Sequence, residues 1–332
     1  MVETSLRVAG IDCGTNSIRL VIADVDNTGM HVVYPKRLDV VRLGEGVDKN
    51  HYFLPEALNR TFAVCREYAE IIASYHTDVI RFIATSASRD AQNRQEFEQG
   101  IHDILGIKPE IISGDQEAQL SFLGATSLLE SKKDLHTPLL VVDLGGGSTE
   151  LVLSGTGTHQ HDVQSAISLN IGCVRMSERY QLSSAPSAPS AEQLHDAISD
   201  IDQQLQYAVE KLPLHTVQGI IGVSGTVTTT SLISMGEHAY SREKVDGITV
   251  DIMQAERACS LIESFTQKDM ENYPVIHPAR RDVVIGGVVI WSRLLHLMTE
   301  LTKNNEYPVT SYVASENGVV EGAILDTANL HF

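Results

Sequence analysis

The sequence has 332 residues, and its 25 Lys and Arg against 43 Asp and Glu give a formal net charge of −18 at pH 7. A hydrophobic content of 42% suits a globular chain with a full core, and the length suggests about two domains. The acidic balance disfavours a binder of nucleic acid or of an anionic membrane, since both surfaces need a basic footprint. We expect neither partner.

The first part of the chain alternates predicted strands and helices. Two β-rich runs, Leu6–Asp12 and Ser17–Asp24, flank a turn at residues 13–16 and predict a hairpin. Apolar residues three and four positions apart predict an amphipathic helix over 55–74. A strand over Asp78–Thr85, a helix over 89–105 and a strand over Pro109–Ile112 are expected next.

The rest of the chain continues the alternation, which predicts an α/β protein with covered sheets. A helix over 115–129 precedes a buried strand at Leu139–Leu144. Residues 183–190 (SSAPSAPS) predict a surface loop, and a long helix follows with an apolar stripe from Leu194 to Leu212. The apolar face of a helix over 283–301, with Val284, Val288, Trp291 and Leu295, fits a core or a subunit interface equally well.

An internal repeat organises the chain. DCGTNSIRLVI (residues 12–22) aligns with DLGGGSTELVL (residues 143–153) with five identities in eleven positions. Both segments predict strand, turn and strand, with an aspartate at the end of the first strand. The repeat predicts two similar domains, each presenting a polar turn to one cleft.

The two turns have the composition of phosphate-binding turns, because small side chains let successive backbone N–H groups converge on an oxygen. The residues concerned are Gly14, Thr15, Asn16 and Ser17 in the first turn and Gly145, Gly146, Gly147 and Ser148 in the second. Asp12 and Asp143 would repel a phosphate but suit Mg²⁺, directly or through its waters. One such turn fits an ordinary tight β-turn equally well, whereas the pair favours phosphate binding.

Eight segments carry a family resemblance. IDCGTNSIRL, VVDLGGGSTEL and GVSGTVTTT (222–230) resemble the actin, hexokinase and Hsp70 superfamily. The sequence is more narrowly similar to the exopolyphosphatase and guanosine-pentaphosphate phosphohydrolase family in RLGEG (42–46), ATSASRDAQN (84–93), ISGDQEAQLSFLG (112–124), RRDVVIGGVVI (280–290) and SENGVVEG (315–322).

The resemblance implies a particular domain organisation. It consists of two ribonuclease-H-like, or actin-like, domains around an interdomain cleft. We expect the first domain over 1–125 and the second over 126–315, with a last helix, 316–332, packing back on the first domain. Long family members carry additional C-terminal helical domains, and this chain resembles the short, two-domain form.

The resemblance also implies functional roles for residues that would otherwise have ordinary structural explanations. Glu117, otherwise a solvated helix glutamate, matches the family's catalytic base, which orients a water for in-line attack on the terminal phosphorus. Asp143 and Glu150 match the Mg²⁺-coordinating acids, and Asp12 is a third acid acting through water. Arg89, otherwise a helix-start arginine, would clamp the polyanion.

Three further positions bear on the site less directly. Arg42 is a second candidate cation for the substrate. Gln116 stands where many relatives carry another acid. Thr226, in the segment where nucleotide-binding members of the superfamily contact adenosine, fits a phosphate contact and a strand–turn–helix joint equally well.

The function implied is a Mg²⁺-dependent exopolyphosphatase that acts on polyphosphate or another polyanionic phosphate. Guanosine pentaphosphate (pppGpp) is the nearest alternative substrate, and an ATP-dependent kinase or a non-catalytic actin-like module is less well supported. A monovalent cation such as K⁺ and a homodimer are expectations from the family.

The location is also an expectation. The N-terminus lacks the basic and apolar regions of a signal peptide, and the longest apolar run, Val283–Trp291, is too short to span a bilayer. The cysteines at positions 13, 65, 173 and 259 have no CxxC spacing, which indicates buried thiols in a reducing compartment. We therefore expect a cytoplasmic protein.

Overall fold

The computed structural model describes residues 5–127, 135–183 and 187–330. The chain divides into two compact units, each described here by itself. Unit 1 comprises Met1–Gly124 and Val319–Phe332, and unit 2 comprises Ala125–Gly318. The end of the predicted helix over 115–129 lies partly outside the described residues.

Unit 1 contains a five-stranded sheet in the order β3-β2-β1-β4-β5. Its strands are β1 (Leu6–Cys13), β2 (Ser17–Asp26), β3 (Gly29–Val40), β4 (Val79–Ala84) and β5 (Glu110–Ile111). β1, β2 and β3 form an antiparallel meander, whereas β4 and β5 run parallel to β1. The predicted hairpin at the N-terminus is confirmed.

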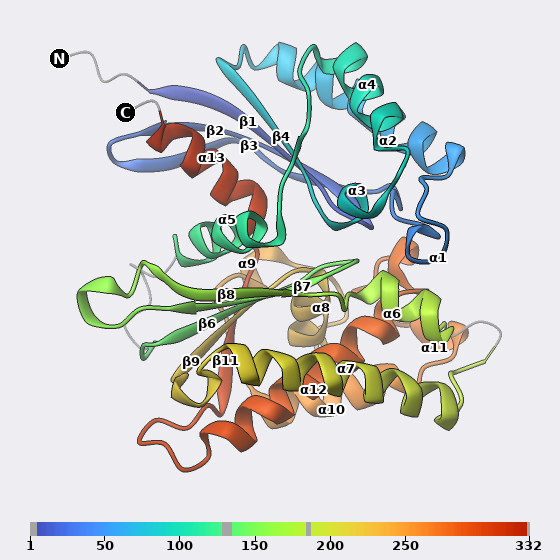
Figure 1. Ribbon diagram of the computed structural model, residues 1–332, viewed down its shortest axis with the longest axis vertical. Coiled ribbons are helices and arrows are strands. Elements are labelled where there is room, and N and C mark those ends of the chain that lie inside the picture. The colour runs from blue at the N-terminus through green and yellow to red at the C-terminus, as the bar shows by residue number, and fades with distance from the viewer. Residues whose placement is uncertain (1–4, 128–134, 184–186, 331–332) are drawn as a thin grey trace. The chain divides into compact units, whose positions relative to one another are not determined.

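Helices cover both faces of this sheet (Figure 1). The helices of unit 1 are α1 (Val47–Asn50), α2 (Pro55–Ser74), α3 (Ser86–Asp90), α4 (Arg94–Leu105), α5 (Gly114–Thr126) and α13 (Val319–Asn329). Residues of alternating parity in β1 and β2 pack against α2 and α4 on one face and against α13 on the other. A Cβ on Gly10 would lie 2.7 Å from Ile324 Cγ1, so the absence of a side chain lets α13 lie close to β1.

The predicted helix over 89–105 is confirmed over 94–105 but is not continuous, because α3 ends at Asp90 and α4 begins at Arg94. Two tertiary contacts hold the break open. The backbone N–H of Gln92 donates to the carbonyl oxygen of His51 at 2.8 Å. The Asn93 side chain accepts from Phe53 N at 2.8 Å and donates to Phe53 O at 3.2 Å, so these residues bond outside a helix.

Unit 2 contains a six-stranded sheet in the order β10-β11-β9-β6-β7-β8. Its strands are β6 (Leu139–Leu144), β7 (Thr149–Ser154), β8 (Val163–Leu169), β9 (Gly219–Val223), β10 (Thr249–Asp251) and β11 (Ser311–Ser315). β6, β7 and β8 repeat the antiparallel meander of unit 1, and β9 lies parallel to β6 as β4 does to β1. Each copy of the sequence repeat thus forms the first two strands of its sheet in chain order, and the two sheets share the meander and the parallel strand beside it.

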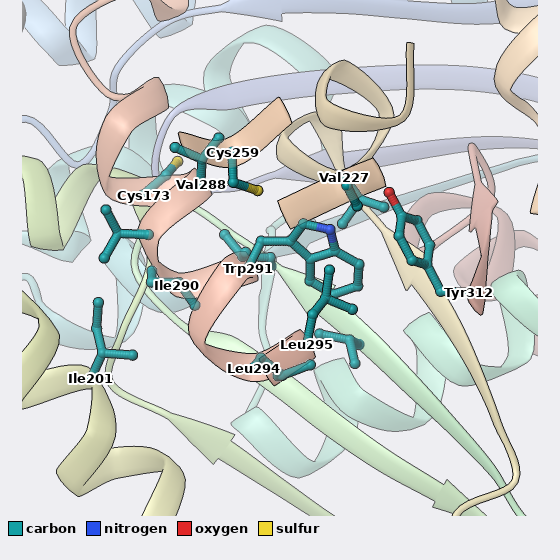
Figure 2. Close-up of a cluster of buried hydrophobic side chains, with 14 of the residues drawn as sticks. Cys173, Ile201, Val227, Cys259, Val288, Ile290, Trp291, Leu294, Leu295 and Tyr312 are labelled. Carbon is teal, nitrogen blue, oxygen red and sulfur yellow. The ribbon is translucent and has the colours of Figure 1, made fainter. Parts of the chain in front are cut away.

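The helices of unit 2 build its core. They are α6 (Cys173–Tyr180), α7 (Ala191–Lys211), α8 (Gly225–Ser234), α9 (Arg242–Val245), α10 (Ile252–Glu263), α11 (Gln267–Glu271) and α12 (Val284–Thr302). The Trp291 ring of α12 meets Tyr312 of β11 edge to face, with ring centroids 4.9 Å apart (Figure 2). Val284, Val288 and Leu295 are buried with Trp291, so the apolar face of α12 is core.

The burial of the most apolar helix and of the cysteines can be compared with the expectations from the sequence. Among the described residues, α12 alone has the length and apolar composition of a membrane-crossing helix, and most of its side chains are buried within unit 2, as in a core helix. All four cysteines are free and buried.

Candidate active site

The two glycine-containing turns close in the same way. In the first, the N–H of Gly14 donates to the carbonyl oxygen of Ser17 at 3.0 Å, and in the second the N–H of Gly145 donates to Ser148 O at 2.9 Å. Each turn joins the first two strands of its own sheet. The repeated segments are therefore alike in backbone hydrogen bonding as well as in sequence.

The first turn is fixed through its carbonyl groups. Thr15 O accepts from Gly44 N at 2.8 Å, and Asn16 O accepts from Arg42 N at 2.9 Å. Arg42 thereby contacts the turn through its backbone. Thr15 Oγ1 and Asn16 Oδ1 are buried and have no hydrogen-bond partner within the protein, which indicates a site for a polar ligand.

The second turn is fixed by the start of α6. The carbonyl oxygens of Gly145 and Gly146 accept from Cys173 N at 3.0 Å and from Val174 N at 2.9 Å, respectively. Gly147 O accepts from Arg175 Nε at 2.7 Å. Since all three carbonyl oxygens bond to α6, the groups that would repel a phosphate are occupied.

The candidate metal acids face each other across a hairpin. Asp143 of β6 and Glu150 of β7 are direct partners in the antiparallel register. Glu150 is fully buried, and its Oε1 accepts from Ser168 Oγ at 2.7 Å. Like charges directly opposite each other are destabilising unless a cation compensates them.

The equivalent position in unit 1 holds an ion pair instead. Asp12 of β1 lies opposite Arg19 of β2, and Arg19 Nη1 donates to Asp12 Oδ2 at 2.8 Å. Burial raises the pKa of Asp12, and the Arg19 guanidinium offsets part of that rise. Asp12 thus faces a positively charged partner across the strands, whereas Asp143 faces the acid Glu150.

This donor set fits Mg²⁺ best in unit 2. The described residues contain no cluster of three or more His, Cys, Asp or Glu side chains suited to a metal. Mg²⁺ commonly uses one or two carboxylates and takes its other ligands from water and substrate phosphate, so Asp143 and Glu150 suffice. A metal role for Asp12 stays a prediction, with Arg19 already bound to its carboxylate.

The structure brings Arg89 and Glu117 together in unit 1. Arg89 Nη1 donates to Glu117 Oε2 at 2.7 Å and to Ile112 O at 3.0 Å. Glu117 is 7% exposed and lies in the first turn of α5, where the helix dipole favours a carboxylate. The ion pair holds the carboxylate at a defined place beside a cation.

Gln116 has a structural use. Its Oε1 accepts from Ser113 N at 3.0 Å, and its own N–H donates to Ser113 Oγ at 3.2 Å. These reciprocal bonds form a capping box at the start of α5. Gln116 thus helps to fix the first turn of the helix that carries Glu117.

Thr226 lies at the start of α8, directly after β9. Val223, the last residue of β9, pairs with Asp143, so α8 begins near the acids. The Thr226 hydroxyl is buried, has no hydrogen-bond partner and lies against Gly287 of α12. The side chain therefore faces a helix contact, and its phosphate role stays a prediction.

Sequence reasoning missed three residues that hold candidate groups in one or the other unit. Arg19, Ser168 and Arg175 each bond to a candidate residue or to a phosphate turn. Arg19 could have been found from the hairpin register, which places it opposite Asp12. The other two depend on β8 and α6, which the sequence analysis did not assign.

Comparison with known proteins then identifies the family. The profile of the Ppx/GppA phosphatase family matches residues 21–331. This chain belongs to that family. It is 36% identical over 331 residues to exopolyphosphatase 2 of Mycobacterium tuberculosis, covering 97% of this chain and 98% of that relative.

Solved structures agree with the family. An exopolyphosphatase-like protein matches with a TM-score of 0.94 and 47% identity over 99% of both chains. The Ppx/GppA enzyme of Aquifex aeolicus matches with a TM-score of 0.76 and 26% identity over 97% of this chain and 100% of that one. The expected two-domain actin-like fold is confirmed, and the chain is a phosphatase of the hydrolase class.

Proposed function

We propose that this chain is a Mg²⁺-dependent exopolyphosphatase that removes the terminal phosphate of inorganic polyphosphate. The observation that carries the proposal is the cross-strand pair of Asp143 and the buried Glu150 beside a glycine turn whose carbonyl groups are bonded elsewhere. This arrangement suits a cation and a phosphate together. The polyphosphate substrate follows from relatives named exopolyphosphatases.

In this proposal Glu117 acts as the base. Its carboxylate orients a water and takes a proton from it as the water oxygen bonds to the terminal phosphorus. The phosphoanhydride bond on the opposite side breaks, so orthophosphate and a chain one phosphate shorter leave. Bound Mg²⁺ would neutralise charge on the phosphate oxygens.

Arg89 has two roles in the same proposal. Its guanidinium holds the Glu117 carboxylate at 2.7 Å before the reaction and offers further N–H donors to a terminal phosphate. The turns at 14–17 and 145–148 would bind phosphate oxygens through backbone N–H groups and hydroxyls.

The same residues serve a second candidate substrate. Guanosine pentaphosphate also ends in a phosphoanhydride, so removal of its γ-phosphate needs no change in base or metal acids. A cytoplasmic homodimer that uses a monovalent cation such as K⁺ completes the proposal as an expectation from the family. A kinase or a non-catalytic actin-like module remains the alternative if no phosphate is released.

The first experiment measures phosphate release with Mg²⁺ from long polyphosphate, short polyphosphate and guanosine pentaphosphate in parallel. We expect release from polyphosphate and a loss of kcat of about 100-fold or more in Glu117→Ala, the scale of a removed general base. KM should change little, because binding uses other groups.

Asp115→Asn is the matched control, since Asp115 lies in the same helical turn but is exposed. It should keep kcat within about twofold, because a solvated carboxylate contributes little. Near-normal turnover in Glu117→Ala would show that the base is assigned wrongly. Release from guanosine pentaphosphate alone would favour the second substrate.

A further inference from the structure

Glu321 places a carboxylate in an otherwise apolar helix–sheet contact. It is 1% exposed in the first turn of α13, whose Val320 and Ile324 pack in an apolar cluster with β1 and β2. Its Oε1 lies 2.7 Å from Lys36 Nζ, and the Lys36 side chain is only 10% exposed. Packing alone does not explain this pair, because apolar residues of similar size usually stabilise a buried contact as well or better.

Lys36 lies at an irregularity in β3. The register between β2 and β3 shifts between Leu20 and Ile22, where β3 carries one residue more than β2. The extra residue falls at the Pro35–Lys36 step. Such β-bulges redirect a side chain and are frequent beside active sites.

The Lys36–Glu321 pair lies on the face of the sheet that Asp12 also occupies. The extra residue of β3 lies opposite the position of β2 that pairs with Gly10 of β1. Val320, the neighbour of Glu321 in α13, contacts this face, because a Cβ on Gly10 would lie 3.2 Å from its Cγ2. Asp12 follows Gly10 by two positions in β1, so its side chain lies on the same face, two positions before the first glycine of the turn.

We propose that Lys36 and Glu321 are positioning residues that set the electrostatic potential at the first phosphate turn, and so tune its affinity for a polyanionic phosphate. In this proposal Lys36 contributes a positive potential at the turn, and Glu321 fixes its position and offsets part of that potential. This inference rests on the proposed binding of phosphate by residues 14–17. It adds two residues that belong to neither the turn nor the candidate metal-binding acids.

The test uses opposite charge changes. Lys36→Met removes one positive charge, so the KM for polyphosphate should rise about threefold, as expected for one charge acting through partly solvated protein over roughly 10 Å. Glu321→Gln removes one negative charge and should lower the KM by a similar factor. The double variant should return near the parent value, and kcat should stay within about twofold throughout.

A binding measurement separates this inference from the proposed activity. Calorimetry of tripolyphosphate with the metal-free protein should give dissociation constants that shift in the same two directions as the KM. If the parent protein releases no phosphate, the proposed function fails, while these dissociation constants still test the pair. Lys36→Gln replaces Lys36→Met if the latter does not fold.

Arg81 and Asp326 provide the matched control. They form another ion pair between the sheet and α13, with Arg81 Nη1 2.6 Å from Asp326 Oδ2, one turn further along the helix. Arg81→Met and Asp326→Asn should lower the melting temperature without moving the dissociation constant in opposite directions. The inference is overturned if Lys36→Met and Glu321→Gln shift the constant in the same direction or leave it unchanged.

Discussion

Glu263, the last residue of α10, is a half-buried carboxyl whose pKa is raised by burial. Because the folded-state pKa lies above that of the unfolded chain, this group favours the folded state at low pH, and that contribution is lost as the pH rises through the folded pKa. Glu263→Gln removes the charge that burial disfavours. Thermal melting should therefore show a higher melting temperature for the variant at pH 7.5, with the gain disappearing as the pH falls towards 4.

Glu300→Gln is the control, because the pKa of Glu300 is shifted in the opposite direction to that of Glu263. The hydrogen bond from Lys303 lowers the pKa of this exposed carboxyl, so its contribution is present at neutral pH and lost on acidification. The variant should melt slightly lower than the parent at pH 7.5. Equal shifts in both variants would contradict the assignment of burial as the cause at Glu263.

At the scale of single residues, motif matching located the important side chains but not their partners. Glu117 and Arg89 were each identified from the family pattern, yet they are 28 positions apart and no local pattern predicts their ion pair. The capping role of Gln116 could not be read from the sequence pattern and is evident only from its hydrogen bonds with Ser113 at the start of α5. Lys36 could not be predicted, because two register shifts in β3 obscure which face of the sheet each of its residues occupies.

At the scale of elements, the second phosphate turn depends on how closely α6 approaches it. A Cβ on Gly172 would lie 2.5 Å from the carbonyl carbon and oxygen of Gly146, which are backbone atoms that cannot rotate away. Gly172→Ala should therefore displace the turn. We expect phosphate release to fall by about tenfold or more, the scale of a misplaced site, with a lower melting temperature.

Gly219→Ala tests whether any added methyl group in unit 2 has this effect. Its Cβ would lie 2.8 Å from Leu139 Cδ2, the end of a flexible side chain, and 3.1 Å from His136 O. This variant should lose stability but keep kcat within about twofold when measured below its melting temperature. Equal losses of kcat in both variants would mean that the effect at Gly172 is not specific to the turn.

Regular elements were predicted well and irregular ones were not. The helix over 55–74 and the strand over 139–144 agree with α2 and β6 in their bounds, because their apolar periodicity is uninterrupted. The predicted helix over 89–105 has the correct end but is interrupted, because tertiary hydrogen bonds at Gln92 and Asn93 outweigh local helix preference. β3 was not assigned, since two register shifts interrupt its alternation.

At the scale of the whole molecule, the net charge of −18 opposes any polyanionic substrate. The Debye length falls from about 30 Å at 0.01 M salt to about 8 Å at 0.15 M, so added salt screens distant acids more than nearby cations. We therefore expect kcat/KM for polyphosphate to rise over this range at constant free Mg²⁺. Initial rates at low substrate concentration measure the effect.

The choice of salt provides the control. Tetramethylammonium chloride screens charge without serving as a small monovalent activator, so the increase should appear in it as well as in KCl. An increase in KCl alone would indicate a specific K⁺ site. A steady fall in both salts would show that local cations such as Arg89, rather than the net charge, govern association.

The discontinuity of unit 1 has a consequence for biosynthesis. The strands β1 and β2 leave the ribosome before unit 2, whereas α13, which covers one of their faces, follows unit 2. Val8 and Val21 therefore remain uncovered while all of unit 2 is translated, although unit 2 can be completed as a continuous segment. The nascent chain is therefore exposed to aggregation at this apolar face while unit 2 is made, and termination before α13 would leave the face uncovered.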